Sequence, residues 1–181
     1  MAPFGETLSH STQAQSVVLL NQQLAAAIDL RDQLRNATWN MREQDFCDTE
    51  KLFNGITVEV EKYADLLARR LAALGGSVNN ATQLALEHTK IAPYELGITD
   101  EYRHLFAVSW ELAAFGQWAR DASCRASAQG DTRTGDLFRT ISRSVDQHLW
   151  AAAAVARQVT PAPRGMRMPA RTPANHATAA A

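Results

Sequence analysis

Histidines are the side chains of this sequence that could most readily bind a transition metal or move protons near neutral pH. The chain contains five of them: His10, His88, His104, His148 and His176. None begins a His-x-x-x-His pair, the spacing that would place two imidazoles on one face of a helix. Glycine-rich phosphate loops, serine nucleophile elbows and cysteine–histidine nucleophile motifs are also absent from the sequence. We therefore expect each histidine to be a surface or interface group.

Arginines near the C-terminus are the residues that could contact phosphate. Arg164, Arg167 and Arg171 lie in a stretch with no acid after Asp146. Guanidinium groups pair well with phosphate oxygens, and many weak contacts of this kind bind DNA without sequence preference because counterions are released. Four prolines in the same stretch indicate a segment that does not fold alone. The tail is therefore a candidate DNA contact, and a purely solubilising tail is the open alternative.

The composition is that of one globular domain, with 181 residues of which 46% are hydrophobic and 20% charged. Two cysteines, Cys47 and Cys124, are too few for a disulfide framework. We expect them to be reduced packing groups. The first residues lack the pattern of a signal peptide, and the apolar runs fall short of the roughly 18 residues of a membrane span. These features predict a cytoplasmic protein without membrane contact, associated with the nucleoid if DNA is bound.

Apolar residues recur at helical spacing in four blocks, over about 16–41, 47–74, 99–128 and 131–157. The second block stops at Gly75-Gly76, a pair that supplies the positive-φ residue of a helix C-terminus. Asp131 is a suitable N-cap for the last block. A long connection over 77–98 contains one amphipathic turn, Thr82–His88. Trp39 and Trp150 are expected to be packing anchors.

Four helices with a long link between the second and third predict an all-α, up-down-down-up bundle with one crossover that carries a short extra helix. We divide the chain into a flexible N-terminal arm (1–13), the four-helix bundle (14–158) and a disordered Pro/Ala/Arg tail (159–181). This helix order is the ferritin-like arrangement, although periodicity alone leaves other four-helix bundles open.

Several runs of sequence, taken in order, resemble the Dps family, the DNA-binding proteins from starved cells. The runs are Ala37-Thr38-Trp39-Asn40-Met41-Arg42, Leu52-Phe53, Asp65-Leu66-Leu67-Ala68-Arg69-Arg70, Asp136-Leu137-Phe138, Ser142-Arg143 and Leu149-Trp150. They are similar to the family's His-Trp-Asn-x-Arg-Gly, His-x-Leu-Phe and Asp-x-x-Ala-Glu-Arg patterns and to its last helix. The resemblance extends from about Leu20 to Trp150. It implies a dodecameric cage that stores iron, protects DNA and oxidises iron at a site between two subunits.

The family's iron ligands fall on five positions of this sequence. Its two histidines fall on Thr38 and Glu50, and its first carboxylate falls on Asn54. The next carboxylate is kept as Asp65, but the last is replaced by Arg69. Iron needs oxygen and imidazole ligands with open positions, and a guanidinium that cannot lose its proton repels a dication. The resemblance therefore predicts a ferroxidase centre that is weak or absent.

On this interpretation iron is not expected at the usual dinuclear site. Asp65 and Arg69 are four apart on one helix, where an ion pair is expected, and Arg69 with Glu50 from another chain could fill the old metal pocket. The alternative is an iron-oxidising and iron-storing enzyme in which Glu50 and Asp65 rebuild a low-affinity metal site. A third alternative is a small bundle that does not form a cage.

Overall fold

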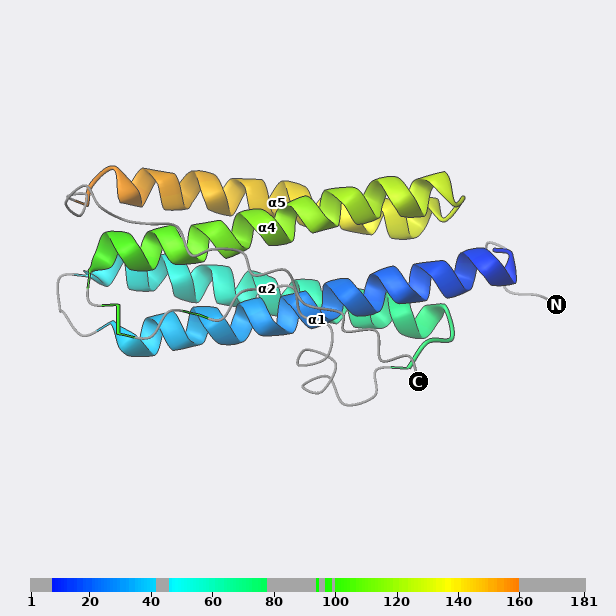
Figure 1. Ribbon diagram of the computed structural model, residues 1–181, viewed down its shortest axis with the longest axis horizontal. Coiled ribbons are helices and arrows are strands. Elements are labelled where there is room, and N and C mark those ends of the chain that lie inside the picture. Colours follow the sequence, from blue (N-terminus) through cyan, green and yellow to red (C-terminus); the bar gives the residue numbers. More distant parts are fainter. Residues whose placement is uncertain (1–7, 42–45, 78–93, 95–96, 99, 160–181) are drawn as a thin grey trace, which may run out of the picture.

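In the computed structural model, residues 8–41, 46–77, 94, 97–98 and 100–159 are described, and they form four long helices (Figure 1). The helices are α1 (His10–Asn40), α2 (Cys47–Ala73), α4 (Glu101–Ala128) and α5 (Thr132–Ala156). The predicted all-α fold is therefore confirmed. The crossover with its amphipathic turn Thr82–His88, most of the arm and nearly all of the tail lie outside the described residues. Among the four helices, none is long and apolar enough to span a membrane.

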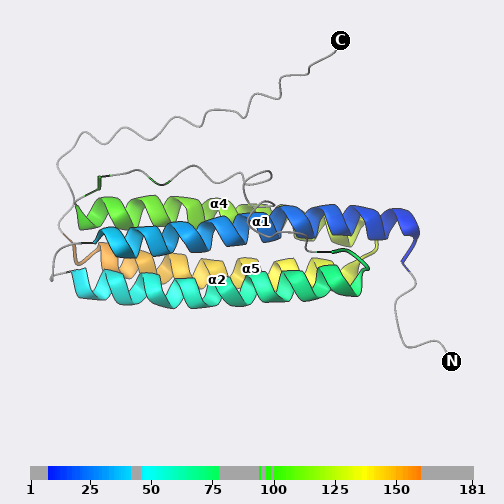
Figure 2. The ribbon, with the colours of Figure 1, turned by 90° about the horizontal axis from the view of Figure 1, so that it is seen from below.

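The helices are arranged as two antiparallel hairpins. α1 and α2 run in opposite directions, as do α4 and α5, while α2 and α4 run in the same direction (Figure 1). Figure 2 shows α1 beside α4 in one layer and α2 beside α5 in the other. This is the up-down-down-up order that the helix lengths and the long link predicted.

α1 begins earlier than its apolar periodicity indicates, at His10 rather than at Ser16. The Ser9 hydroxyl caps the helix by accepting the Thr12 N–H at 3.1 Å. The next polar side chains bind carbonyls at the ends of other helices: Thr12 Oγ1 donates to Gln129 O and Gln13 Nε2 to Leu74 O. The first turns of α1 are therefore held by polar contacts, which a search for apolar spacing does not detect.

Two helix ends follow the sequence signals. Gly75 has φ of 74°, and the Gly76 N–H donates to Leu71 O at 3.0 Å, which closes the C-terminus of α2 as predicted. The Asp131 carboxylate accepts the Thr134 N–H at 3.0 Å and caps α5, also as predicted.

The core is built from large apolar side chains of all four helices. Side chains with no exposed area include Leu20, Leu34, Phe53, Phe115 and Phe138. Burying a side chain of this size stabilises the fold by about 2 kcal/mol.

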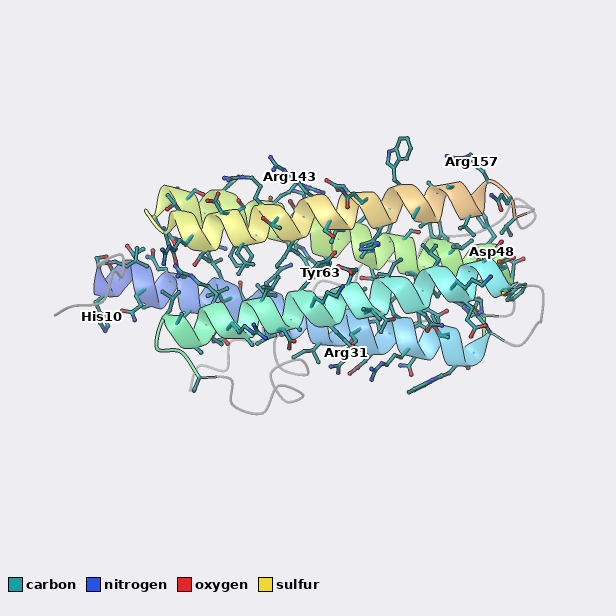
Figure 3. The ribbon with its side chains drawn as sticks, turned by 180° about the vertical axis from the view of Figure 1, so that it is seen from behind. His10, Arg31, Asp48, Tyr63, Arg143 and Arg157 are labelled. Carbon is teal, nitrogen blue, oxygen red and sulfur yellow. The ribbon has the colours of Figure 1, made fainter. Side chains whose placement is uncertain are left out.

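A polar contact joins α2 to α5 beside this core. Tyr63 stacks on Phe115 with ring centroids 6.3 Å apart, and its hydroxyl donates to Ser144 Oγ at 2.7 Å. Figure 3 shows Tyr63 between the two helices. Burial raises the pKa of Tyr63, with a smaller opposing effect of the Ser144 hydrogen bond. The phenol therefore stays neutral, and its hydrogen bond fixes the spacing of the two helices.

A buried ion pair ties the end of α2 to the turn between α4 and α5. Arg70 Nη2 lies 2.6 Å from Asp131 Oδ1, and Arg70 Nε donates to Thr134 Oγ1 at 2.9 Å. Burial would raise the pKa of Asp131, but the hydrogen bonds of Thr134 and the charge of Arg70 lower it. The carboxylate is therefore ionised although none of its residue is exposed.

Four side chains expected in the interior are exposed in the single chain. Trp39 is 74% exposed and Trp150 80%, so neither is a packing anchor within one subunit. Cys47 and Cys124 are also exposed, and the expectation that their thiols are packing groups is wrong.

Candidate functional site

Two of the five predicted ligand positions meet on the surface between α1 and α2. Thr38 of α1 and Asn54 of α2 line one groove of about 290 Å³. The residues that line it are Arg35, Thr38, Trp39, Asn54, Thr57, Val58 and Glu61. The sequence reasoning therefore identified residues that the fold places together, although they are distant in sequence.

The groove offers poor ligands for iron. The Thr38 hydroxyl donates to Leu34 O at 3.0 Å, so its proton is engaged by the helix backbone. Thr57 likewise donates to Phe53 O at 2.8 Å. Asn54 contributes a neutral amide. Hydroxyls and amides of this kind bind Fe(II) more weakly than imidazole and carboxylate do.

The one carboxylate that lines the groove is already paired. Glu61 Oε1 lies 2.5 Å from Arg35 Nη2, and both side chains are partly exposed. Sequence reasoning missed this pair because its members lie on different helices with no local spacing to reveal them. The pair neutralises the acid, so the groove has no free negative charge with which to attract a cation.

Glu50 and Asp65 do not lie near one another within one chain. Both are on α2, fifteen residues apart, which is about 22 Å along a helix axis. A single metal ion therefore cannot use both carboxylates of the same chain. A site that contains both would need a second chain.

Asp65 and Arg69 do not form the ion pair expected from their spacing. Glu50, Asp65 and Arg69 are all exposed, and within the described part of the chain none of them has a hydrogen bond or an ion pair. The described part of the chain also contains no group of three or more His, Cys, Asp or Glu side chains that could hold a metal ion.

The described histidines give no metal site either. His104 is fully buried, which contradicts the surface role expected for it, and its Nδ1 shares a hydrogen bond with the Tyr94 hydroxyl. Burial lowers the pKa of His104, and the nearby Ile98 carbonyl and Asp100 oppose that effect. Burial also lowers the pKa of His148, against the charge of Glu59. Both imidazoles are therefore neutral at pH 7. The predicted DNA-contact residues Arg164, Arg167 and Arg171 lie outside the described residues.

Comparison with known proteins matches this bundle to a family. A family described as the ferritin-like domain matches residues 17–160, which is nearly the whole bundle. The chain belongs to the ferritin-like family.

Similar proteins match this ferritin-like chain over most of its length. It is 29% identical over 132 residues to a DNA protection during starvation protein of Agrobacterium fabrum, covering 73% of this chain and 82% of the relative. It is 26% identical to the protein of the same name from Streptococcus suis, over 76% of this chain and 80% of the relative. A crystal structure of a Dps protein from Bacillus brevis superposes with a TM-score of 0.74 at 25% identity, covering 82% of this chain and 99% of that one. Within the ferritin-like family the chain is therefore similar to proteins of the Dps type.

Proposed function

We propose that this ferritin-like chain is a cage-forming subunit that protects DNA under stress and sequesters iron weakly if at all, because its inter-subunit ferroxidase centre is largely lost. The relatives' names support the protective role, since two of them are called DNA protection during starvation proteins. The matched region spans nearly the whole bundle. The subunit is expected to be homo-oligomeric, as a dodecamer, with iron as its substrate or cargo.

The observation that carries the loss of activity is the chemistry of the five ligand positions. Thr38 is bound to its own helix, and Asn54 is neutral. A cation, Arg69, stands where the family has its last carboxylate on α2. Redox chemistry with a pair of Fe(II) ions requires both ions to be held by anionic or imidazole ligands with open positions. Glu50 and Asp65 alone supply too few ligands for that.

An iron oxidation assay tests the proposal. Fe(II) is added to the purified assembly with hydrogen peroxide, and oxidation is followed by absorbance. We expect a rate within about twofold of the protein-free rate, because no preorganised site lowers the barrier. The matched control is the Glu50→Gln, Asp65→Asn double variant, which removes both remaining carboxylates and should behave like the wild type.

Fast, stoichiometric oxidation by the wild type that the double variant lacks would contradict this proposal. It would favour the alternative of an iron-oxidising and iron-storing enzyme with a rebuilt low-affinity site. Size-exclusion chromatography addresses the cage separately, because a dodecamer elutes far ahead of a dimer or of a bundle that does not assemble.

A further inference from the structure

One face of α1 and α2 is open in the single chain. Trp39 is 74% exposed, Val58 51% and Leu66 44%, and the first two line the groove between these helices. Exposed apolar side chains that gather beside a groove are typical of an interface. The proposed function places a second copy of the chain at these ligand positions, and we propose that across the two-fold axis Glu50 of each copy pairs with the partner's Arg69. The inference rests on the proposed function, since it names what fills the altered ligand positions.

The charges of α2 indicate what kind of partner fits. Most of them are paired within the described chain, in the ion pairs Asp48–Lys51, Glu59–Lys62, Glu61–Arg35 and Arg70–Asp131. Only Glu50, Asp65 and Arg69 have no partner among the described residues. A partner must therefore offer one cation, one anion and a hydrogen-bond donor for the remaining carboxylate. A second copy of α2 offers all of these.

A single antiparallel register satisfies these groups together. In a two-fold pairing of identical helices, two residues face each other when the axis passes through the midpoint between them. The midpoint of Glu50 and Arg69 lies between Glu59 and Val60, and Asn54 with Asp65 has the same midpoint. The register that brings Glu50 to the partner's Arg69 therefore also brings the Asn54 amide to the partner's Asp65.

The centre of this register brings no unpaired like charges together. The acids nearest the axis are Glu59 and Glu61, and each is already paired within its own chain. Val58 also lies near the axis, where its exposed side chain would be covered. The unpaired and opposite charges lie toward the ends of the contact, where the two copies make the same pair twice.

The distances set the crossing angle of the two helices. Glu50 and Arg69 each lie about 14 Å along α2 from the axis. Helices that cross at about 20° stay within reach of long side chains over that distance, whereas a crossing of about 50° would separate them. The proposed pairing therefore requires the shallow class of packing.

A charge reversal tests the pairing in metal-free, chelator-treated protein. Arg69→Glu and Glu50→Arg each place like charges at both symmetric contacts. We expect each to raise the dissociation constant of the two-fold pair about tenfold, measured by sedimentation velocity on dilution. The double variant restores both ion pairs with their charges exchanged. Its dissociation constant should therefore return to within about threefold of the wild-type value. Arg143→Glu is the matched control, because Arg143 is exposed on α5 and points away from the bundle (Figure 3).

The pairing would be overturned if the single variants kept the wild-type dissociation constant. It would also be overturned if the double variant dissociated as readily as either single variant. A second measurement protects against poor folding of the reversals. Asn54→Cys and Asp65→Cys are combined in a background of Cys47→Ser and Cys124→Ser, and a short bis-maleimide should join two chains if the register holds. Absence of the joined dimer would also overturn the proposal. The iron oxidation assay distinguishes the two proposals. Fast oxidation by the wild type would contradict the proposed function. Slow oxidation, together with a double variant that does not recover the dissociation constant, would contradict only this inference.

Discussion

Arg69 is the residue with the largest electrostatic effect on the altered centre. A guanidinium remains protonated in proteins, so its charge cannot be removed to admit a metal ion. At 4 Å and an effective dielectric constant of about 20, each positive charge of a cation is repelled by about 4 kcal/mol. The neutral groups Thr38 and Asn54 cannot offset that repulsion. One substitution of an acid by a base therefore cancels the attraction of one of the two acids that remain, and the five positions together keep one net negative charge.

Arg69→Glu should recover part of the metal affinity. It replaces the fixed cation by a carboxylate one turn from Asp65, and two acids at this spacing bind divalent ions. We expect Co²⁺ to bind at least about tenfold more tightly than in the wild type, a change of about 1.4 kcal/mol, measured by titration calorimetry. Arg69→Gln is the control that removes the repulsion without adding a ligand. If the Glu and Gln variants bind equally, repulsion is relieved but no site is rebuilt.

At the scale of the helices, α2 is fixed to α5 by two polar contacts beside the apolar core. One is the hydrogen bond from Tyr63 to Ser144, and the other is the ion pair of Arg70 with Asp131. Asp131 also caps α5. A single carboxylate at the turn between α4 and α5 therefore stabilises the start of α5 and binds Arg70 of α2. This position determines where the exposed face of α2 lies relative to the rest of the bundle.

Asp131→Asn should lower the free energy of unfolding by about 3 kcal/mol, since it leaves Arg70 buried without its counterion. The measurement is urea unfolding at pH 7, with Asp136→Asn on the exposed side of α5 as a control expected to change little. The pKa of Asp131 is lowered in the folded state. Its stabilising effect is therefore fully present above the unfolded value of about 4 and is lost as the pH falls through the folded value. Below pH 4 the free energy of unfolding should therefore fall less steeply with decreasing pH in the variant than in the wild type. An equally steep fall in both proteins would contradict this.

Local sequence signals predicted the helices well, but they could not predict contacts between residues that are distant in the sequence. Gly75 and Asp131 act within one turn of chain, so their roles can be read from neighbouring residues. The early start of α1 depends on carbonyls of other helices. The Arg35–Glu61 pair and the separation of Glu50 from Asp65 depend on how helices are placed in three dimensions. The candidate site was found through its resemblance to a family, since five neutral or charged residues have no spacing that identifies a lost metal centre.

At the scale of the whole molecule, two large apolar side chains of the single chain are open to solvent. Trp39 and Trp150 lie on different helices, and both are largely exposed. Assembly would remove this apolar surface from water, at about 25 cal/mol per Å². A cage would also repeat any DNA-binding tail many times on one particle, which raises the overall affinity without new contacts.

Truncating the chain after Arg157 should weaken DNA retardation in a gel at low salt. The truncation keeps α5 intact, because this helix ends at Ala156. It removes Arg164, Arg167 and Arg171, and each lost phosphate contact lowers the counterion release that drives binding. The matched control is the full-length chain with these three residues changed to Gln, which should lose retardation to a similar extent. Unchanged retardation of the truncated protein would rule the tail out.

The tight turn between α4 and α5 also bears on how the subunit acquires its shape. Only Gln129, Gly130 and Asp131 separate the two helices, so closing this hairpin costs little chain entropy. The contacts between α1 and α4, in contrast, span a much longer stretch of sequence. Contacts that are local in sequence form sooner during folding. We expect the hairpin of α4 and α5 to form early, before the two hairpins of the bundle pack against each other.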